Sequence, residues 1–170
     1  NLRLIVRRPS SVAEKLAMLY AATAASGTRA IVYAATRKNV EQVAAHITSR
    51  GVKAAAYHGG LDAGARERVQ DDFMSDVKPV IVATNAFGMG VDKPDIRLVV
   101  HYDVPGSVEA YYQEAGREGG DGAPADCVLL YARGDRRSPE YFIRAAAPSR
   151  DVVERTYRHA QAFGSGGAPL

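Results

Sequence analysis

The part of the sequence richest in groups for ligand chemistry follows a short apolar run, Val80–Ala83. A hydroxyl and an amide come first, glycines then permit close approach of the backbone to a ligand, and a carboxylate precedes a proline. The same pattern also suits an ordinary glycine-rich loop whose apolar side chains fill the core. The segment reads Ala83-Thr84-Asn85-Ala86-Phe87-Gly88-Met89-Gly90-Val91-Asp92-Lys93-Pro94.

A second segment places a guanidinium group at the start of a predicted helix. Thr36 and Arg37 follow the apolar run Ala30–Tyr33. A hydroxyl, a cation and a helix N-terminus close together suit binding of a phosphate. The alternative is a capped helix start with a solvated arginine.

A third segment contains adjacent glycines, Gly59 and Gly60, directly after His58. The glycines allow a ligand to approach the backbone, and Arg66, one to two helical turns later, is a candidate for contact with a sugar-phosphate backbone. Taken alone, His58 is more often a satisfied turn residue than a ligand or a base.

A fourth segment, Tyr111–Gly122, ends a predicted helix in several glycines. These would let Gln113 and Arg117 reach a bound nucleotide, whereas the alternative is a loop with a solvated arginine. In doubly wound sheets, ligands bind beyond the carboxyl ends of the strands. We therefore expect all of these segments at that edge of a sheet.

The elements that position these segments alternate between short β-rich runs and longer helical patterns, which predicts an α/β fold with a parallel sheet and helices on both faces. Helix caps are predicted at Ser11, Asp62 and Ser107. The predicted helices run to about Ala25, from Asn39 to Arg50, to about Met74 and to about Ala115. The predicted strands are Leu2–Val6, Ala30–Tyr33, Ala54–Tyr57, Val80–Ala83, Leu98–His101 and Cys127–Tyr131.

The C-terminal part of the sequence differs from this pattern. We expect a main domain over residues 1–147 and a helical extension with a disordered tail over residues 148–170, because Asp151–Phe163 is amphipathic and the tail is rich in glycine. The absence of an initiating methionine predicts that the chain is part of a longer protein.

Composition narrows the class of protein. The net charge of +3 is compatible with a polyanionic partner, but the excess is small and both signs are interspersed. Cys127 is the only cysteine, so an intrachain disulfide and a multi-cysteine zinc site are excluded, and a reducing, cytoplasmic location is expected. The apolar runs are far shorter than the roughly 20 residues of a membrane-spanning helix.

Taken in order, these segments resemble helicase motifs IV to VI of superfamily 2, and the match to the RecQ family of ATP-dependent DNA helicases is close. The resemblance covers about residues 1–133 and is carried most specifically by Ala83-Thr84-Asn85-Ala86-Phe87-Gly88-Met89-Gly90 and Tyr111-Tyr112-Gln113-Glu114. It implies a RecA-like helicase C-terminal lobe, the second of two lobes that clamp ATP and Mg²⁺ between them. Single-stranded DNA would lie across both lobes, and ATP hydrolysis would drive 3′ to 5′ movement in DNA repair or recombination.

The resemblance also assigns roles to residues. Asp92, Gln113, Gly116 and Arg117 would face the nucleotide, with Asp92 near the ribose and Arg117 near the phosphates as the catalytic candidate together with Gln113. The candidates for contact with the DNA backbone are Thr36, Arg37, His58, Gly59, Arg66, Thr84 and Asn85. No metal ligands are expected in this chain, because neither a phosphate-binding Gly-rich Lys-Ser/Thr loop nor an Asp-Glu metal motif is present. The chain alone is therefore expected not to turn over ATP.

One departure concerns the family pattern Gly-Arg-x-Gly-Arg. The residue usually assigned as the arginine finger is Gly120 in this chain, and the sequence leaves open whether a neighbour such as Arg136 or Arg137 replaces it. The missing arginine favours one alternative, a non-catalytic nucleic-acid-binding or protein-binding module derived from a helicase.

Two further alternatives remain at this point. An RNA helicase lobe is disfavoured by Phe87-Gly88-Met89-Gly90, and a small-molecule α/β domain by the lack of Gly-x-Gly-x-x-Gly after the first strand.

Overall fold

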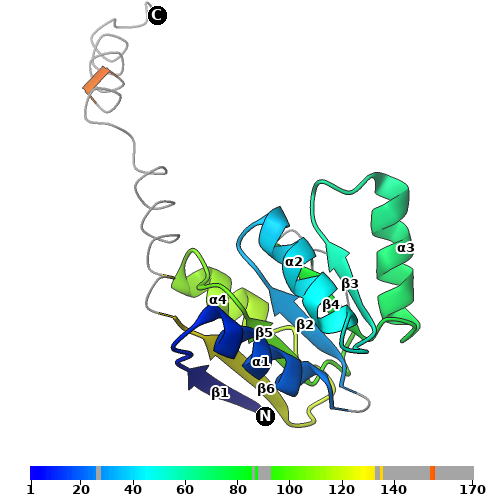
Figure 1. Cartoon of the computed structure of the whole chain (residues 1–170), viewed down its shortest axis with the longest axis horizontal. Coiled ribbons are helices and arrows are strands. Elements are labelled where there is room, and N and C mark those ends of the chain that lie inside the picture. The colour runs from blue at the N-terminus through cyan, green and yellow to red at the C-terminus, as the bar shows by residue number, and fades with distance from the viewer. Residues whose placement is uncertain (26–27, 86, 88–92, 133–134, 136–153, 156–170) are drawn as a thin grey trace, which may run out of the picture. The chain divides into compact units, whose positions relative to one another are not determined.

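The computed structural model describes residues 1–25, 28–85, 87, 93–132, 135 and 154–155 (Figure 1). The chain divides into two compact units, Asn1–Pro139 and Glu140–Leu170. In the second unit, only Glu154 and Arg155 are described, and both are helical. The predicted boundary at residue 147 and nearly all of the predicted helix Asp151–Phe163 lie outside the described residues.

The first unit is built on a six-stranded sheet in the order β1-β6-β5-β2-β4-β3. Every adjacent pair of strands is parallel, so the carboxyl ends of all six meet at one edge. The predicted parallel sheet is confirmed. The strands are β1 (Leu2–Arg7), β2 (Ala30–Tyr33), β3 (Ala54–Tyr57), β4 (Val80–Ala83), β5 (Leu98–His101) and β6 (Ala125–Leu130).

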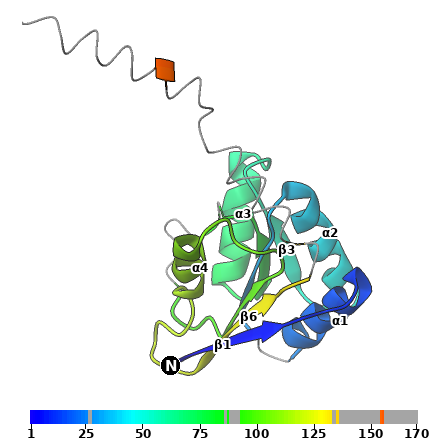
Figure 2. The ribbon, with the colours of Figure 1, turned by 90° about the vertical axis from the view of Figure 1, so that its left-hand side faces the viewer.

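Helices cover both faces of this sheet, also as predicted. Viewed along the sheet, α1 and α2 lie on one side and α3 and α4 on the other (Figure 2). On the first side, Leu19 and Ile47 pack into a core cluster, and on the second side Phe73 and Phe87 do so. The helices are α1 (Val12–Thr23), α2 (Arg37–Thr48), α3 (Ala63–Met74) and α4 (Val108–Ala115).

Helix caps set where these helices begin. The side chains of Asp62 and Ser107 cap α3 and α4 as predicted. The prediction that the second helix begins at Asn39 is wrong, because the hydroxyl of Thr36 accepts a hydrogen bond from the Asn39 backbone N–H at 3.1 Å and so starts α2 at Arg37.

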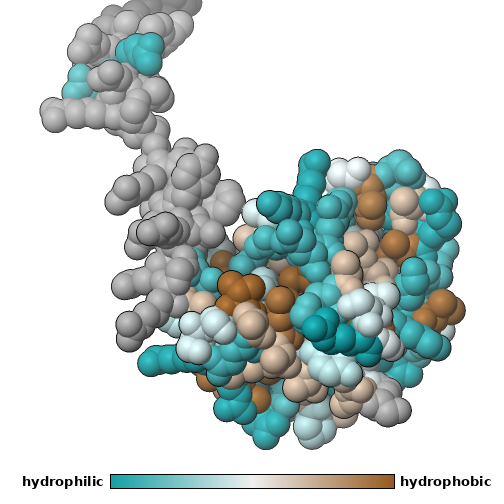
Figure 3. Space-filling view, in the orientation of Figure 1, coloured by the Kyte–Doolittle hydropathy of each residue, from teal (hydrophilic) through white to brown (hydrophobic). Residues whose placement is uncertain are grey.

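On the face that carries α1 and α2, exposed hydrophobic residues form small groups among hydrophilic ones (Figure 3). Within the described ranges, each helix is too short or too polar to cross a bilayer.

The glycines after α4 have specific backbone requirements. Gly119 has φ +65°, in the left-handed region that disfavours other residues, and a Cβ there would lie 3.0 Å from the Ala123 carbonyl oxygen. Gly120 has a φ outside that region. Gly120 is instead close to Pro94, whose Cα would be 3.3 Å from an added Cβ.

We therefore predict that Gly119→Ala lowers the free energy of unfolding by about 2 kcal/mol, because the new side chain adds backbone strain and crowds a backbone carbonyl. Gly106→Ala is the matched control, since an added Cβ at Gly106 meets nothing within 4 Å. Urea unfolding of both variants measures the difference. Equal stability of the two would contradict the requirement for glycine at position 119.

Candidate nucleic-acid and nucleotide interface

The loops after β2, β4 and β3 lie side by side at the carboxyl edge of the sheet. The Ala34 N–H donates to the Ala83 carbonyl at 2.9 Å, and the Thr84 N–H donates to the Tyr57 carbonyl at 3.3 Å. Neighbouring strands thus continue their pairing into the loops. The strand order brings together candidates that are distant in the sequence, which are Thr36, Arg37, His58, Gly59, Thr84 and Asn85.

The corner after β2 presents the guanidinium group of Arg37 to solvent. Arg37 is exposed, and it lies over the glycine turn of the next loop: a Cβ added to Gly60 would be 3.1 Å from Arg37 Nη1. The two loops therefore form one continuous surface, and the absence of a side chain at Gly60 makes room for the arginine.

His58 lies beneath this surface, not on it. Only 4% of the residue is exposed, its Nδ1 accepts from the Gly60 N–H at 3.2 Å, and its Nε2 is 3.3 Å from the Glu41 carboxylate. These contacts fit the interpretation of His58 as a satisfied turn residue that fixes the backbone of Gly59 and Gly60. Arg66, by contrast, is exposed on the first turns of α3.

The loop after β4 begins with a turn in which the Phe87 N–H donates to the Thr84 carbonyl at 3.1 Å. Thr84 is half-buried and Asn85 is exposed, whereas Phe87 is buried against Tyr57 and Phe73. Phe87 thus fills the core, as expected for an ordinary glycine-rich loop, while the polar residues before it reach the surface. Asp92, the residue expected near the ribose of the nucleotide, lies outside the described residues.

The nucleotide candidates Gln113, Gly116 and Arg117 belong to α4 and its C-terminal end. Gln113 and Gly116 are exposed, and Arg117 is half-buried. Burial raises the pKa of the Tyr33 hydroxyl above its usual value, and the nearby Arg117 guanidinium opposes that shift. Arg117 therefore lies within electrostatic range of Tyr33, the last residue of β2.

Two contacts on either side of Arg117 fix the helix to the sheet. Nε2 of His101, a fully buried residue in β5, is 3.0 Å from the Glu114 carboxylate. Beyond α4, Glu118 accepts a hydrogen bond from the Val99 N–H at 2.9 Å. The backbone that carries Arg117 is held at both ends.

The fourth segment lies at the carboxyl edge only in part, because Glu114 in α4 contacts His101, the last residue of β5. The helix starts near that edge, but the residues after it lie beside the beginning of β5, where the Gly119 N–H donates to the Ile96 carbonyl at 3.0 Å. The segment runs back across the face of the sheet because a helix that follows a parallel strand returns in the opposite direction. The residues that follow Arg117 thus lie away from the DNA candidates, whereas Arg117 itself lies near Tyr33 at the end of β2.

Glu118 is a buried acid that the sequence reasoning missed. It is 3% exposed, and burial raises its pKa to about 7, although the hydrogen bond from Val99 opposes the shift. A glutamate between Arg117 and glycine looks solvated in the sequence, and its partner is distant along the chain. The described residues contain no group of His, Cys, Asp or Glu arranged to hold a metal ion.

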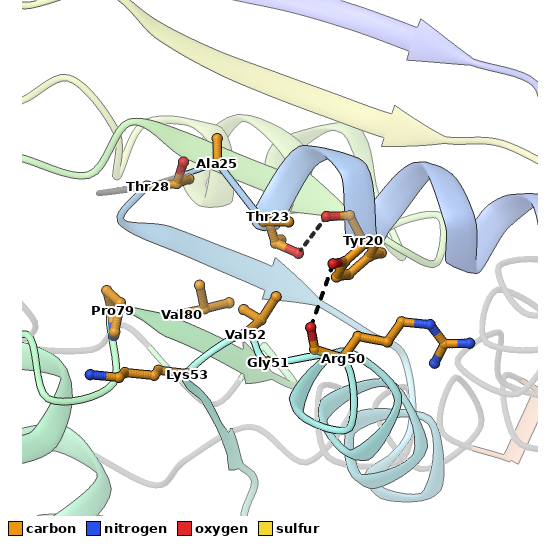
Figure 4. Close-up of a pocket in the computed structure, with 11 residues that line it drawn as sticks. Tyr20, Thr23, Ala25, Thr28, Arg50, Gly51, Val52, Lys53, Pro79 and Val80 are labelled. Carbon is orange, nitrogen blue, oxygen red and sulfur yellow. Dashed lines mark hydrogen bonds between the residues drawn. The ribbon is translucent and has the colours of Figure 1, made fainter.

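A cavity of about 390 Å³ lies at the opposite, amino edge of the sheet (Figure 4). It is lined by the ends of α1 and α2 and the start of β4, including Thr23, Lys53 and Val80. The Arg50 side chain extends away from the other lining residues, and its guanidinium contacts His46. None of the candidates predicted from the sequence lines this cavity, so it lies apart from the interface.

The raised pKa of Glu118 predicts a dependence of stability on pH. Since the folded chain holds this proton more tightly than an unfolded glutamate of pKa 4.5, the free energy of unfolding falls as pH rises from about 4.5 through 7. In the parent protein, this decrease in the free energy of unfolding is on the order of 2 kcal/mol. We expect Glu118→Gln to abolish the decrease and to be more stable than the parent at pH 8. Urea unfolding from pH 5 to 8 tests this, with exposed Glu67→Gln as the control; an unchanged pH profile in Glu118→Gln would contradict it.

Comparison of the sequence with known proteins identifies the family to which the chain belongs. Residues 12–122 match the family described as helicase conserved C-terminal domain. ATP-dependent DNA helicase RecQ of Haemophilus influenzae is 49% identical over 112 residues, which are 66% of this chain and 18% of that protein. ATP-dependent helicase wrn-1 of Caenorhabditis elegans is 39% identical over 158 residues, which are 91% of this chain and 15% of that protein.

Solved structures agree on the fold. A DEAD box protein from Methanococcus jannaschii has a TM-score of 0.72 at 24% identity, with 85% of this chain and 40% of that chain covered. The E. coli DEAD-box protein SrmB also has a TM-score of 0.72 at 24% identity, with 79% of each chain covered. The chain spans less than a fifth of the length of these two curated relatives. It belongs to the helicase conserved C-terminal domain family and is similar in sequence to RecQ-type DNA helicases.

Proposed function

We propose that this chain is the second motor lobe of a RecQ-type 3′ to 5′ DNA helicase that couples ATP hydrolysis to movement along single-stranded DNA. The observation that carries the proposal is the joint surface of the loops after β2, β3 and β4, which gathers the DNA candidates at one edge. The relatives at 39% and 49% identity are named as DNA helicases or helicases, whereas the DEAD-box structures support the fold alone.

The proposed DNA surface consists of groups that bind a strand without reading its sequence. The hydroxyls of Thr36 and Thr84, the amide of Asn85 and the guanidinium groups of Arg37 and Arg66 suit phosphate and sugar oxygens. His58 would act indirectly, because it is buried and fixes the turn that exposes the backbone of Gly59. Such contacts suit a motor, which must grip each nucleotide in turn regardless of its base.

For the nucleotide, Gln113, Gly116 and Arg117 would face ATP held mainly by a first lobe, and Asp92 would lie near the ribose. The first lobe would also supply the phosphate-binding loop and the ligands of Mg²⁺, neither of which this sequence contains. The role proposed for Arg117 is to offset charge on the phosphoryl group. The intact protein would be an intracellular, DNA-associated enzyme of repair or recombination.

The two ends of α2 offer a matched test of the DNA surface. Arg37→Ala in the intact protein should weaken binding of oligothymidine about fivefold at low salt and flatten the salt dependence, because one phosphate contact is lost. Arg50, just beyond the other end of the same helix, is also exposed but lies at the amino edge. Arg50→Ala should leave affinity unchanged, with fluorescence anisotropy against salt concentration as the measurement.

Equal losses in the two arginine variants would indicate that only net charge matters, and no loss in either would remove the carboxyl edge from the DNA surface. Both results would contradict the proposed function.

Gly120 allows the catalytic proposal to be tested. An arginine finger contributes about 10³ to 10⁵ in rate, so Gly120→Arg in the intact protein should raise DNA-stimulated ATP turnover at least tenfold with little change in KM for ATP. Gly120→Ala is the control, since it adds the Cβ that crowds Pro94 without a guanidinium group. Steady-state phosphate release measures both variants.

A parent protein already as active as Gly120→Arg would mean that another residue supplies the finger, and Arg136 and Arg137 would be mutated first. A parent and a Gly120→Arg variant that both bind DNA without ATP turnover would favour the second candidate function, a non-catalytic DNA-binding module. The glycine at the finger position is the observation that favours that candidate.

A further inference from the structure

Asp103, in the loop after β5, fixes the corner that carries Thr36 and Arg37. One carboxylate oxygen, Oδ2, accepts hydrogen bonds from the Ala35 backbone N–H and from the Asn39 side-chain amide, each at 2.8 Å. These donors lie on either side of the Thr36-Arg37 pair. The direction in which the corner faces therefore depends on a carboxylate from the loop after another strand.

Lys15 in α1 is the cation that accompanies this carboxylate. Lys15 is only 3% exposed, and its Nζ lies 3.8 Å from Asp103 Oδ1 and 2.8 Å from Asp135 Oδ2. The same Nζ is 4.4 Å from the centre of the Tyr102 ring. Asp135 also accepts a hydrogen bond from the Ala132 N–H at 2.8 Å, which fixes the second carboxylate.

Packing alone gives no reason for a charge at this position. Lys15 lies on the buried face of α1 with Leu19 and Thr23, where an apolar side chain would fill the same space. Taking an ammonium group out of water costs several kcal/mol, which a buried ion pair often does not recover. A charge kept in such a place is better explained by what it positions than by the stability it contributes.

We propose that Lys15 and Asp103 are positioning residues for DNA binding, an inference that rests on the proposed function of the Thr36-Arg37 corner. The buried ammonium group orients Asp103 and offsets part of the charge of two carboxylates. Asp103 then orders the corner so that Arg37 meets a phosphate. Without Lys15, the negative charges of Asp103 and Asp135 are no longer offset by a cation. Asp103 then no longer fixes the direction of the corner, and negative charge remains beside a phosphate-binding surface.

The test is a double-mutant cycle in the intact protein, with oligothymidine affinity at fixed low salt as the readout. Lys15→Met keeps most of the volume and should weaken binding about fivefold. In an Arg37→Ala background the same change should cost less than about twofold, because the group that Lys15 positions is already gone. In an Arg66→Ala background the losses should multiply, since Arg66 is carried by α3.

Lys78→Met is the matched control. Lys78 is a partly exposed lysine paired with Asp72 at 3.4 Å, so its replacement changes the net charge equally and should leave affinity unchanged. Asp103→Asn is the second variant in case Lys15→Met does not fold: it keeps an oxygen acceptor but loses the attraction to Lys15, and it should show the same dependence on Arg37. A purely structural role would lower the melting temperature of these variants without any coupling to Arg37.

The outcomes separate the two levels of the proposal. If Arg37→Ala leaves affinity unchanged, the proposed DNA surface is wrong. If Arg37→Ala weakens binding but folded Lys15→Met and Asp103→Asn do not, or if their effects multiply with that of Arg37→Ala, the positioning role is overturned while the DNA surface stands.

Discussion

The parallel pairing of β2, β4 and β3 is the constraint on which the proposed interface depends. Since all three strands end at the same edge, loops separated by tens of residues become neighbours, and hydrogen bonds from Ala34 and Thr84 extend the pairing beyond the strands. A nucleic-acid backbone needs several polar groups along a line, which no single loop provides. The sheet supplies that line without any of the loops having to be long.

Polar contacts between elements then fix details that the sheet alone leaves free. Asp103 ties the loop after β5 to the start of α2, and His101 and Glu118 hold the two ends of the segment that carries Arg117. Arg117 in turn lies near Tyr33, the last residue of β2. One proposed nucleotide group, Arg117, thus lies close to the strand end from which the corner of Thr36 and Arg37 begins.

Much of this domain could be predicted from local patterns. The bounds of β2, β3, β4 and β5 agree with the apolar runs, because buried strands of a parallel sheet are nearly continuous in hydrophobic residues. The start of α2 and the extent of β6 were predicted wrongly by a few residues, since a threonine cap and a flanking alanine carry weaker signals than an apolar stripe. Element identity is a local property, and the sequence pattern captures it well.

Local sequence patterns could not predict the features that depend on contacts between residues far apart in the sequence. Neither the strand order, nor the burial of Lys15 between two carboxylates, nor the hydrogen bond between Glu118 and Val99 has a local signature. The same holds for Gly120, whose constraint comes from Pro94 and not from its own backbone angles. Charged residues in loops look solvated in a sequence, and only the fold shows which are buried.

Hydrogen exchange of the intact protein with and without oligothymidine tests whether DNA lies on the carboxyl edge of the sheet, because it locates the bound strand without altering a residue. A DNA surface at the carboxyl edge predicts slower exchange in peptides that cover residues 34–39, 58–61 and 84–85. Peptides around residues 50–54, at the amino edge beside the cavity, should exchange at the same rate in both states. Protection at the amino edge with none at the carboxyl edge would contradict this placement of the DNA.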